Sequence, residues 1–142
     1  MLNFQYFKKM KKLIILIIIL GYSMPSWAKW QGMQVPLPTI GDKYFVDPSS
    51  LNERFINSTK YSTVRVLISH STAEKLGQLS EVALWEANCS ERVIRLRTLA
   101  GYRGEMGKGS IFVINNNPKE WKVPDLNSLE EAIQLFMCGP PK

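Results

Sequence analysis

Two cysteines, Cys89 and Cys138, are the residues whose chemistry most constrains the class of this protein. A cysteine can be a reactive nucleophile, a metal ligand or half of a disulfide. Cys89 lies between Glu86 and Glu91, whose negative charges disfavour a reactive thiolate, and no histidine is adjacent in sequence to act as its base. The N-terminal segment described below predicts export, and two cysteines in a small exported chain most simply form one disulfide, so we expect Cys89 to pair with Cys138.

The other candidate catalytic and metal-binding groups are sparse. His70 is the only histidine, and structural zinc usually takes four ligands, so we expect no metal. Asp47 and Ser50 offer an acid and a hydroxyl, but the chain lacks the GxSxG motif of a hydrolase. The stretch GEMGKGS also fails as a phosphate-binding loop, because Tyr102 and Gly109 occupy positions where that motif needs glycine and serine or threonine. We therefore expect a glycine-rich connection with positive φ angles, no cofactor and no enzymatic activity.

A group of cationic side chains forms the candidate binding face. Arg95 and Arg97 share a parity within an expected strand and would project from one face, with Tyr102 and Arg103 nearby. One interpretation is the solvated outer face of a half-buried sheet. The other is a cationic surface for an acidic partner, such as a polyanionic glycan, an acidic protein or lipid headgroups.

The first 28 residues are typical of a secretory signal peptide. Four lysines at positions 8, 9, 11 and 12 precede the apolar run Leu13 to Leu20, and Ser26 and Ala28 stand where a cleavage site needs small residues. The apolar run is about half of the ~20 residues of a membrane-spanning helix. No cysteine lies near the cleavage point, so we expect an exported protein without a lipid anchor, in the periplasm or secreted to the cell surface. Residues 29–142 would then form a single domain.

The net charge argues against one class of partner. Without the four N-terminal lysines, 14 of the 18 basic residues remain against 12 acidic ones, so the formal net charge falls from +6 to +2. Nucleic-acid-binding domains usually carry a far stronger positive charge. We therefore expect no nucleic-acid partner.

Hydrophobic periodicity predicts the elements that position these side chains. Period-two patterns and apolar runs predict strands at 44–47, 61–71, 80–90, 92–99 and 111–115. The sequence Asp-Pro-Ser-Ser from Asp47 predicts a turn that ends the first strand. A change of parity between Val93 and Ile94 is compatible with a bulge there.

The C-terminal segment predicts one helix. Ser128 and Glu131 have the spacing of a capping box, and Gly139 follows the last expected helical residue, Cys138. The expected apolar stripe consists of Leu129, Ala132, Ile133 and Phe136. Because short connections join strands only in antiparallel order, we predict an α+β fold, with an antiparallel sheet of five to six strands and the helix on one face.

A set of short features extends over most of the chain: Trp30, the segment YFVDPSSL (44–51), the segment NCSERVIRLR (88–97), MGKGS (106–110), Trp121 and Cys138. In their order and spacing these features resemble the surface-adhesin protein E family. The resemblance implies about six antiparallel strands and a C-terminal helix tied by a Cys89–Cys138 disulfide. It also implies a non-enzymatic protein that binds host extracellular-matrix and serum proteins, such as laminin, vitronectin and plasminogen, and that can dimerise. The alternative function is a periplasmic structural or accessory protein that binds an envelope component or a small ligand.

Overall fold

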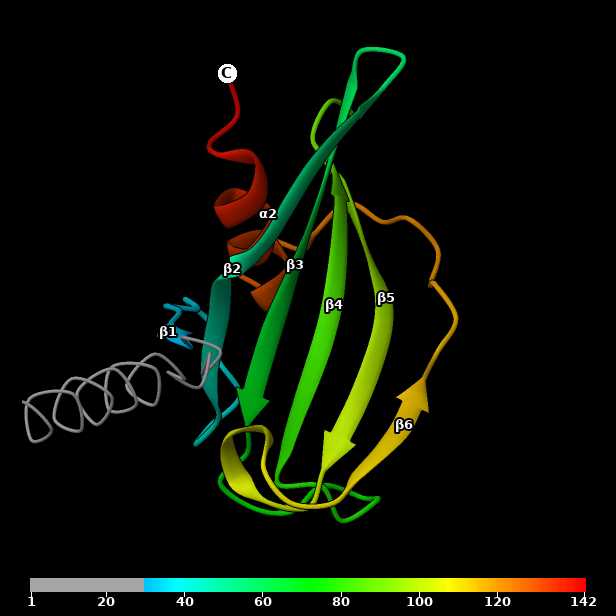
Figure 1. The fold of residues 1–142 in the computed structure, drawn as a ribbon. Coiled ribbons are helices and arrows are strands. Elements are labelled where there is room, and N and C mark those ends of the chain that lie inside the picture. The colour runs from blue at the N-terminus through cyan, green and yellow to red at the C-terminus, as the bar shows by residue number, and fades with distance from the viewer. Residues whose placement is uncertain (1–29) are drawn as a thin grey trace, which may run out of the picture.

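The computed structural model describes residues 30–142, which form one curved sheet with a single α-helix against it (Figure 1). The predicted signal peptide lies outside these described residues. The elements are β1 (Gln31–Gly32), β2 (Lys43–Ile56), β3 (Thr59–Ser69), β4 (Ser80–Asn88), β5 (Val93–Tyr102), the 3-10 helix η1 (Glu105–Gly107), β6 (Ile111–Asn115) and α2 (Leu129–Cys138). Among these described residues no helix is long and apolar enough to cross a membrane.

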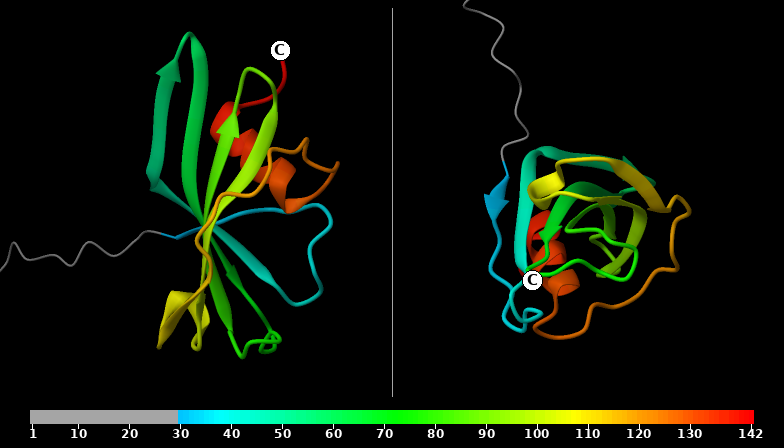
Figure 2. Two further views of the ribbon diagram at one scale, coloured as in Figure 1. Left: turned by 90° about the vertical axis from the view of Figure 1, so that its right-hand side faces the viewer. Right: turned by 90° about the horizontal axis from the view of Figure 1, so that it is seen from below.

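The strands follow one another across the sheet in chain order, and every neighbouring pair is antiparallel. Short connections account for this order, because an antiparallel neighbour needs only a hairpin. The predicted α+β class and the helix on one face are confirmed. Figure 2 shows the twist of the sheet and the β2–β3 hairpin, which extends beyond the other strands.

The first predicted strand was too short. We expected a strand at 44–47 that ended in a turn, whereas β2 continues to Ile56 through a bulge. Asp47 pairs with Arg65 and Asn52 pairs with Thr63, so the four residues 48–51 lie opposite the single residue Val64. The Asp-Pro-Ser-Ser segment therefore forms a bulge and not a chain reversal, because β2 pairs with β3 again after it.

The real reversal is a two-residue hairpin turn at Asn57 and Ser58. Their φ angles are +48° and +65°. Positive φ at both central residues is typical of the tight turn whose twist matches that of the flanking strands. This turn places Arg54 directly opposite Tyr61.

The bulge in β5 also differs from the prediction. Val93 and Ile94 pair regularly, and the register shifts instead where Leu96 pairs with Trp85 but Thr98 pairs with Leu84. Arg97 is the extra residue. The shift brings Leu99 to the helix side of the sheet together with Ile94 and Leu96, all of which pack against the core.

The core lies between α2 and the facing side of the sheet. Its buried sheet residues include Val64, Val66, Ala83, Ala87 and Ile94. Successive side chains of a strand point to opposite faces of the sheet. Because Val64 and Val66 and the residues paired with them face α2, the residues between them in β3 and β4 face away from the helix. The two faces of the sheet therefore carry different chemistry.

The helix begins and ends as predicted, but its buried side differs. Ser128 accepts a hydrogen bond from the Glu131 N–H, and the Glu131 carboxylate accepts one from the Asn127 N–H, one residue before the expected position. The buried residues of α2 are Ile133, Gln134 and Met137. Of the predicted stripe, Ile133 is buried and Leu129 packs against the core, whereas Phe136 is 37% exposed. Gln134 lies one turn before Cys138, so the disulfide to the end of β4 accounts for this rotation of the helix.

Candidate binding face

Strands β2, β4 and β5 bring charged side chains together on the sheet face opposite α2. Thr63 of β3 pairs with Glu86 of β4, and Glu86 pairs with Arg95 of β5. Thr63 has the opposite parity to Val64, so Glu86 and Arg95 lie on the face that does not contact the helix. Arg54 reaches the same point from β2.

Glu86 is the centre of this cluster and is fully buried. Its Oε1 accepts from Arg54 Nη2 at 2.6 Å. Its Oε2 accepts from Arg95 Nε at 2.8 Å and lies 2.7 Å from Arg95 Nη2. Arg97 Nη1 lies farther away, 3.8 Å from Oε1. One buried carboxylate is thus surrounded by three guanidinium groups, which leaves an excess of positive charge around it.

Two guanidinium groups of this cluster stack on aromatic rings. Arg95 lies over the ring of Trp121 at 4.3 Å from the centroid, and Arg54 lies over Tyr61 at 5.6 Å. The two rings are themselves 6.2 Å apart. Trp121 arrives from the segment after β6, where Lys122 forms a backbone bridge to Ile94 of β5. Cation–π stacking limits the conformations of both arginines.

A second buried carboxylate fixes a fourth arginine on this face. Asp47 is fully buried, and its Oδ2 lies 2.5 Å from Arg65 Nη2. Burial acts to raise the pKa of the Asp47 carboxyl, but hydrogen bonds from Ser49 and Arg65 and the charge of Arg65 outweigh it, so this pKa is lowered. We call Arg54, Arg65, Arg95 and Arg97, with Glu86 and Asp47 beneath them, the arginine face.

The four sequence-predicted binding residues are divided between two places. Arg95 and Arg97 belong to the arginine face. Tyr102 and Arg103 lie at the opposite end of β5, where Arg103 stacks over Phe112 at 5.2 Å and donates to the Leu76 carbonyl at 3.4 Å. The sequence reasoning missed Arg54, Arg65 and Trp121. The hairpin signal Asn57–Ser58 places Arg54 beside Tyr61, but the expected end of the first strand obscured it.

Asp47 and Ser50 have a structural role. The Ser50 hydroxyl donates to the Asp47 backbone oxygen at 2.6 Å and accepts from the Arg65 N–H at 2.8 Å. Both bonds stabilise the bulge in β2. His70 is bonded to Asp42, so within the described residues it does not join these two groups in a hydrolase arrangement.

The glycine-rich connection after β5 is held by Ser80. The Ser80 hydroxyl donates to the Gly104 carbonyl at 2.6 Å and accepts from the Gly107 N–H at 2.8 Å. Gly107 has φ +71° and lies against Leu67, where an added Cβ would be 3.3 Å from the Leu67 side chain. The expected positive φ angle is confirmed, and this loop closes the end of the sheet on the arginine side.

The predicted disulfide between Cys89 and Cys138 is present and joins the end of β4 to the end of α2. Cys89 is therefore a structural anchor. Within residues 30–142, no cluster of three or more histidine, cysteine, aspartate or glutamate side chains is arranged to hold a metal ion.

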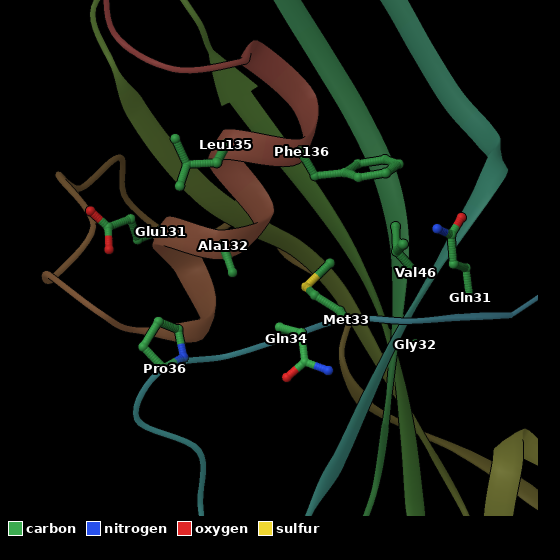
Figure 3. A pocket seen from close by; sticks show the side chains of 10 residues that line it. All are labelled: Gln31, Gly32, Met33, Gln34, Pro36, Val46, Glu131, Ala132, Leu135 and Phe136. Atoms are coloured by element: carbon green, nitrogen blue, oxygen red, sulfur yellow. The ribbon is translucent and has the colours of Figure 1, made fainter.

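An apolar hollow of about 370 Å³ lies on the helix side of the sheet, between residues 31–36 and α2 (Figure 3). Leu135 and Phe136, which are 41% and 37% exposed, form its helix wall, and Met33 lies across from them. Because α2 turns Ile133 and Met137 toward the core, Leu135 and Phe136 face the hollow.

Comparison with known proteins decides the family. A family model described as "Surface-adhesin protein E" matches residues 30–139. The chain belongs to the surface-adhesin protein E family. Membership implies an exported or surface location and favours a binding protein over an enzyme. No curated protein matches the sequence.

Two solved structures share the fold of this family member. Crystal form II of Haemophilus influenzae protein E superposes with a TM-score of 0.56 at 11% identity, over 75% of this chain and 94% of that one. Protein E from non-typeable Haemophilus influenzae gives a TM-score of 0.52 at 11% identity, over 80% of this chain and 79% of that one. At this identity the likeness concerns the fold alone, so the arginine face must be argued from this chain.

Proposed function

We propose that this protein is an exported, non-enzymatic adhesin that binds an acidic surface of a host extracellular-matrix or serum protein through the arginine face. Membership of the surface-adhesin family supports the general class. The positive charge of the arginine face supports an acidic partner.

The observation that carries this proposal is that the arginines are held in place yet remain accessible. The side chains of Arg54, Arg65 and Arg97 are 51%, 47% and 36% exposed, although each is directed toward a buried carboxylate. A free arginine loses about 2 kcal/mol of rotamer entropy when a partner immobilises it. Here Glu86, Asp47 and the aromatic rings have already restricted these side chains, so binding costs less entropy.

The charge balance of the face selects an anionic partner. Four guanidinium groups stand over two carboxylates. One arginine per carboxylate would neutralise the buried charge, so stability alone does not call for the excess. The unused N–H donors of these planar groups suit the carboxylates of an acidic protein surface.

Surface plasmon resonance with immobilised laminin, vitronectin and plasminogen tests the proposal. Arg97→Gln is the most informative variant, because Arg97 has the longest contact with Glu86 and its loss disturbs the buried carboxylate least. A lost charge-assisted hydrogen bond is worth about 1.5–3 kcal/mol, so we expect binding to weaken by roughly tenfold or more. Binding by the wild type should also weaken as salt is raised.

Arg103→Gln is the matched control, because it removes the same charge at the far end of β5. We expect it to bind as the wild type does. If the wild type binds none of the three proteins, or if both variants lose affinity equally, the arginine face is not the binding surface.

A further inference from the structure

The outer edge of β2 is unpaired along the part of the strand that leads to the hairpin turn. β1 pairs with β2 at Phe45 and Val46, and within residues 30–142 no other strand pairs with this side of β2. The β2–β3 hairpin projects past the ends of β4 and β5 and away from α2 (Figure 2). Native proteins usually cover or interrupt a long edge strand, because its free backbone groups can pair with another chain.

The hydrogen bonds of the hairpin show which backbone groups of β2 are free. Phe55 is opposite Lys60 of β3, and the Lys60 carbonyl accepts from the Cys89 N–H on the β4 side at 2.9 Å. In an antiparallel ladder both backbone groups of a residue point to the same side, and bonded pairs alternate with unbonded ones. Lys60 therefore turns its groups toward β4, and Phe55 turns its own groups outward. The same holds for Glu53, two residues earlier.

The side chains on this edge are also uncovered. Every residue from Leu51 to Ile56 is exposed, and Phe55 is 69% exposed. The side chain of Arg54, between Glu53 and Phe55, is 51% exposed and belongs to the arginine face, where three guanidinium groups surround one carboxylate. Because neighbouring side chains point to opposite faces, the edge offers an apolar ring on one face and surplus positive charge on the other.

We propose that an extended segment of another protein adds to the sheet here as an antiparallel strand beside β2. A strand is the occupant that this edge selects, because an extended backbone matches a row of free N–H and C=O groups. The segment exchanges both hydrogen bonds of a bonded pair with Phe55 and again with Glu53. It carries an apolar residue opposite Phe55 and an acidic residue opposite Arg54, since such cross-strand pairs stabilise a sheet. This strand addition is separate from the proposed contact of the arginine face with a matrix or serum protein.

A second copy of this chain fits the edge less well. When two antiparallel β2 edges pair about a two-fold axis, each residue faces one of the same parity. A register that joins Glu53 to Phe55 of the other copy places Arg54 opposite the same arginine. A register centred on Glu53 places two glutamates opposite each other. Like charges directly opposite destabilise a sheet, so the edge favours a segment of different sequence.

Nuclear magnetic resonance with a synthetic strand tests the backbone contact. The exported chain, labelled with ¹⁵N, is titrated with the blocked peptide Thr-Val-Val-Glu-Thr-Thr, whose second valine lies opposite Phe55 and whose glutamate lies opposite Arg54. At saturation we expect the N–H groups of Glu53 and Phe55 to exchange with solvent roughly tenfold more slowly or less. The control peptide is N-methylated on that valine and on the threonine after the glutamate, which removes both donors and keeps the side chains. It should bind roughly tenfold more weakly.

Glu53→Pro tests the assigned edge. Proline has no N–H and is tolerated in an edge strand where that group faces outward, so the variant keeps its pairing with β3 and loses one outward donor. Glu53→Thr is the matched control, because it removes the same carboxylate and its pair with Lys60 but keeps the N–H. We expect Glu53→Thr to bind the peptide as the wild type does, and Glu53→Pro to bind it roughly five- to tenfold more weakly.

The strand addition is overturned if the peptide does not bind, if the N-methylated peptide binds equally well, or if Glu53→Pro and Glu53→Thr bind alike. It is also overturned if sedimentation velocity shows a wild-type dimer that Glu53→Pro dissociates, because the edge then pairs two copies of this chain. If Glu53→Pro does not fold, the comparison of the two peptides with the wild type decides alone.

Discussion

Replacement of Glu86 by glutamine should destabilise this protein more than the loss of any exposed carboxylate. The substitution keeps the size of the side chain but removes the charge that holds Arg54 and Arg95 together. Removal of one partner of a fully buried ion pair costs about 3–5 kcal/mol. The Arg54 side chain is 51% exposed and can turn toward water, so part of this cost is recovered. We therefore expect a loss of about 2–3 kcal/mol in the free energy of unfolding.

Urea unfolding followed by tryptophan fluorescence measures this loss, because Trp85 and Trp121 lie in the core and beside Arg95 respectively. The corresponding fall in Tm is roughly 10 °C for a domain of this size. Glu53→Gln is the control, since its pair with Lys60 is exposed and should contribute within about 0.5 kcal/mol. If Glu86→Gln unfolds at the same urea concentration as Glu53→Gln, Glu86 does not organise the arginine face.

Three further outcomes follow from the structure. Cys89→Ser and Cys138→Ser should each lower the free energy of unfolding equally, by about 4 kcal/mol in the chain-entropy account, and the double variant should be no less stable than either; additive losses in urea unfolding would contradict the pairing. Because the pKa of Asp47 is lowered in the folded state, its stabilisation is present above the ordinary value of 3.8 and is lost as pH falls through the lower folded value, so Asp47→Asn should show a shallower loss of stability in acid than the wild type. Ser128→Ala removes the cap of α2 and should cost about 1 kcal/mol, visible as a lower Tm, whereas an unchanged Tm would show that the disulfide alone holds the helix.

Local patterns were sufficient to predict the strands at 61–71, 80–90 and 111–115 and both ends of the helix. Each of these depends on side-chain alternation or on capping residues within a few positions of one another. The continuation of β2 was missed, because pairing with β3 carries the strand through the Asp-Pro-Ser-Ser turn chemistry and no local signal records that pairing. The buried side of α2 was predicted in part, since Ile133 and Leu129 face the core. The burial of Gln134 and the exposure of Phe136 were missed, because they depend on the long-range disulfide at Cys138.

The candidate site, too, could be predicted from the sequence only in part. The parity of Arg95 and Arg97 indicated a shared face, which the structure places around Glu86. Arg54 lies in the arginine face because of the register of the β2–β3 hairpin. Trp121 lies beside it because Lys122, in the segment after β6, forms a backbone bridge to Ile94 of β5. Both are contacts between residues far apart in sequence, so periodicity could not predict them.

Chemical footprinting of the complex shows whether the arginine face contacts an acidic partner. Phenylglyoxal modifies accessible arginines, and mass spectrometry compares the modification of Arg65, Arg97 and Arg103 with and without bound laminin, vitronectin or plasminogen. We expect protection of Arg65 and Arg97 in the complex and unchanged modification of Arg103. Protection of Arg103 alone, or equal modification of all three in a complex that has formed, would contradict it.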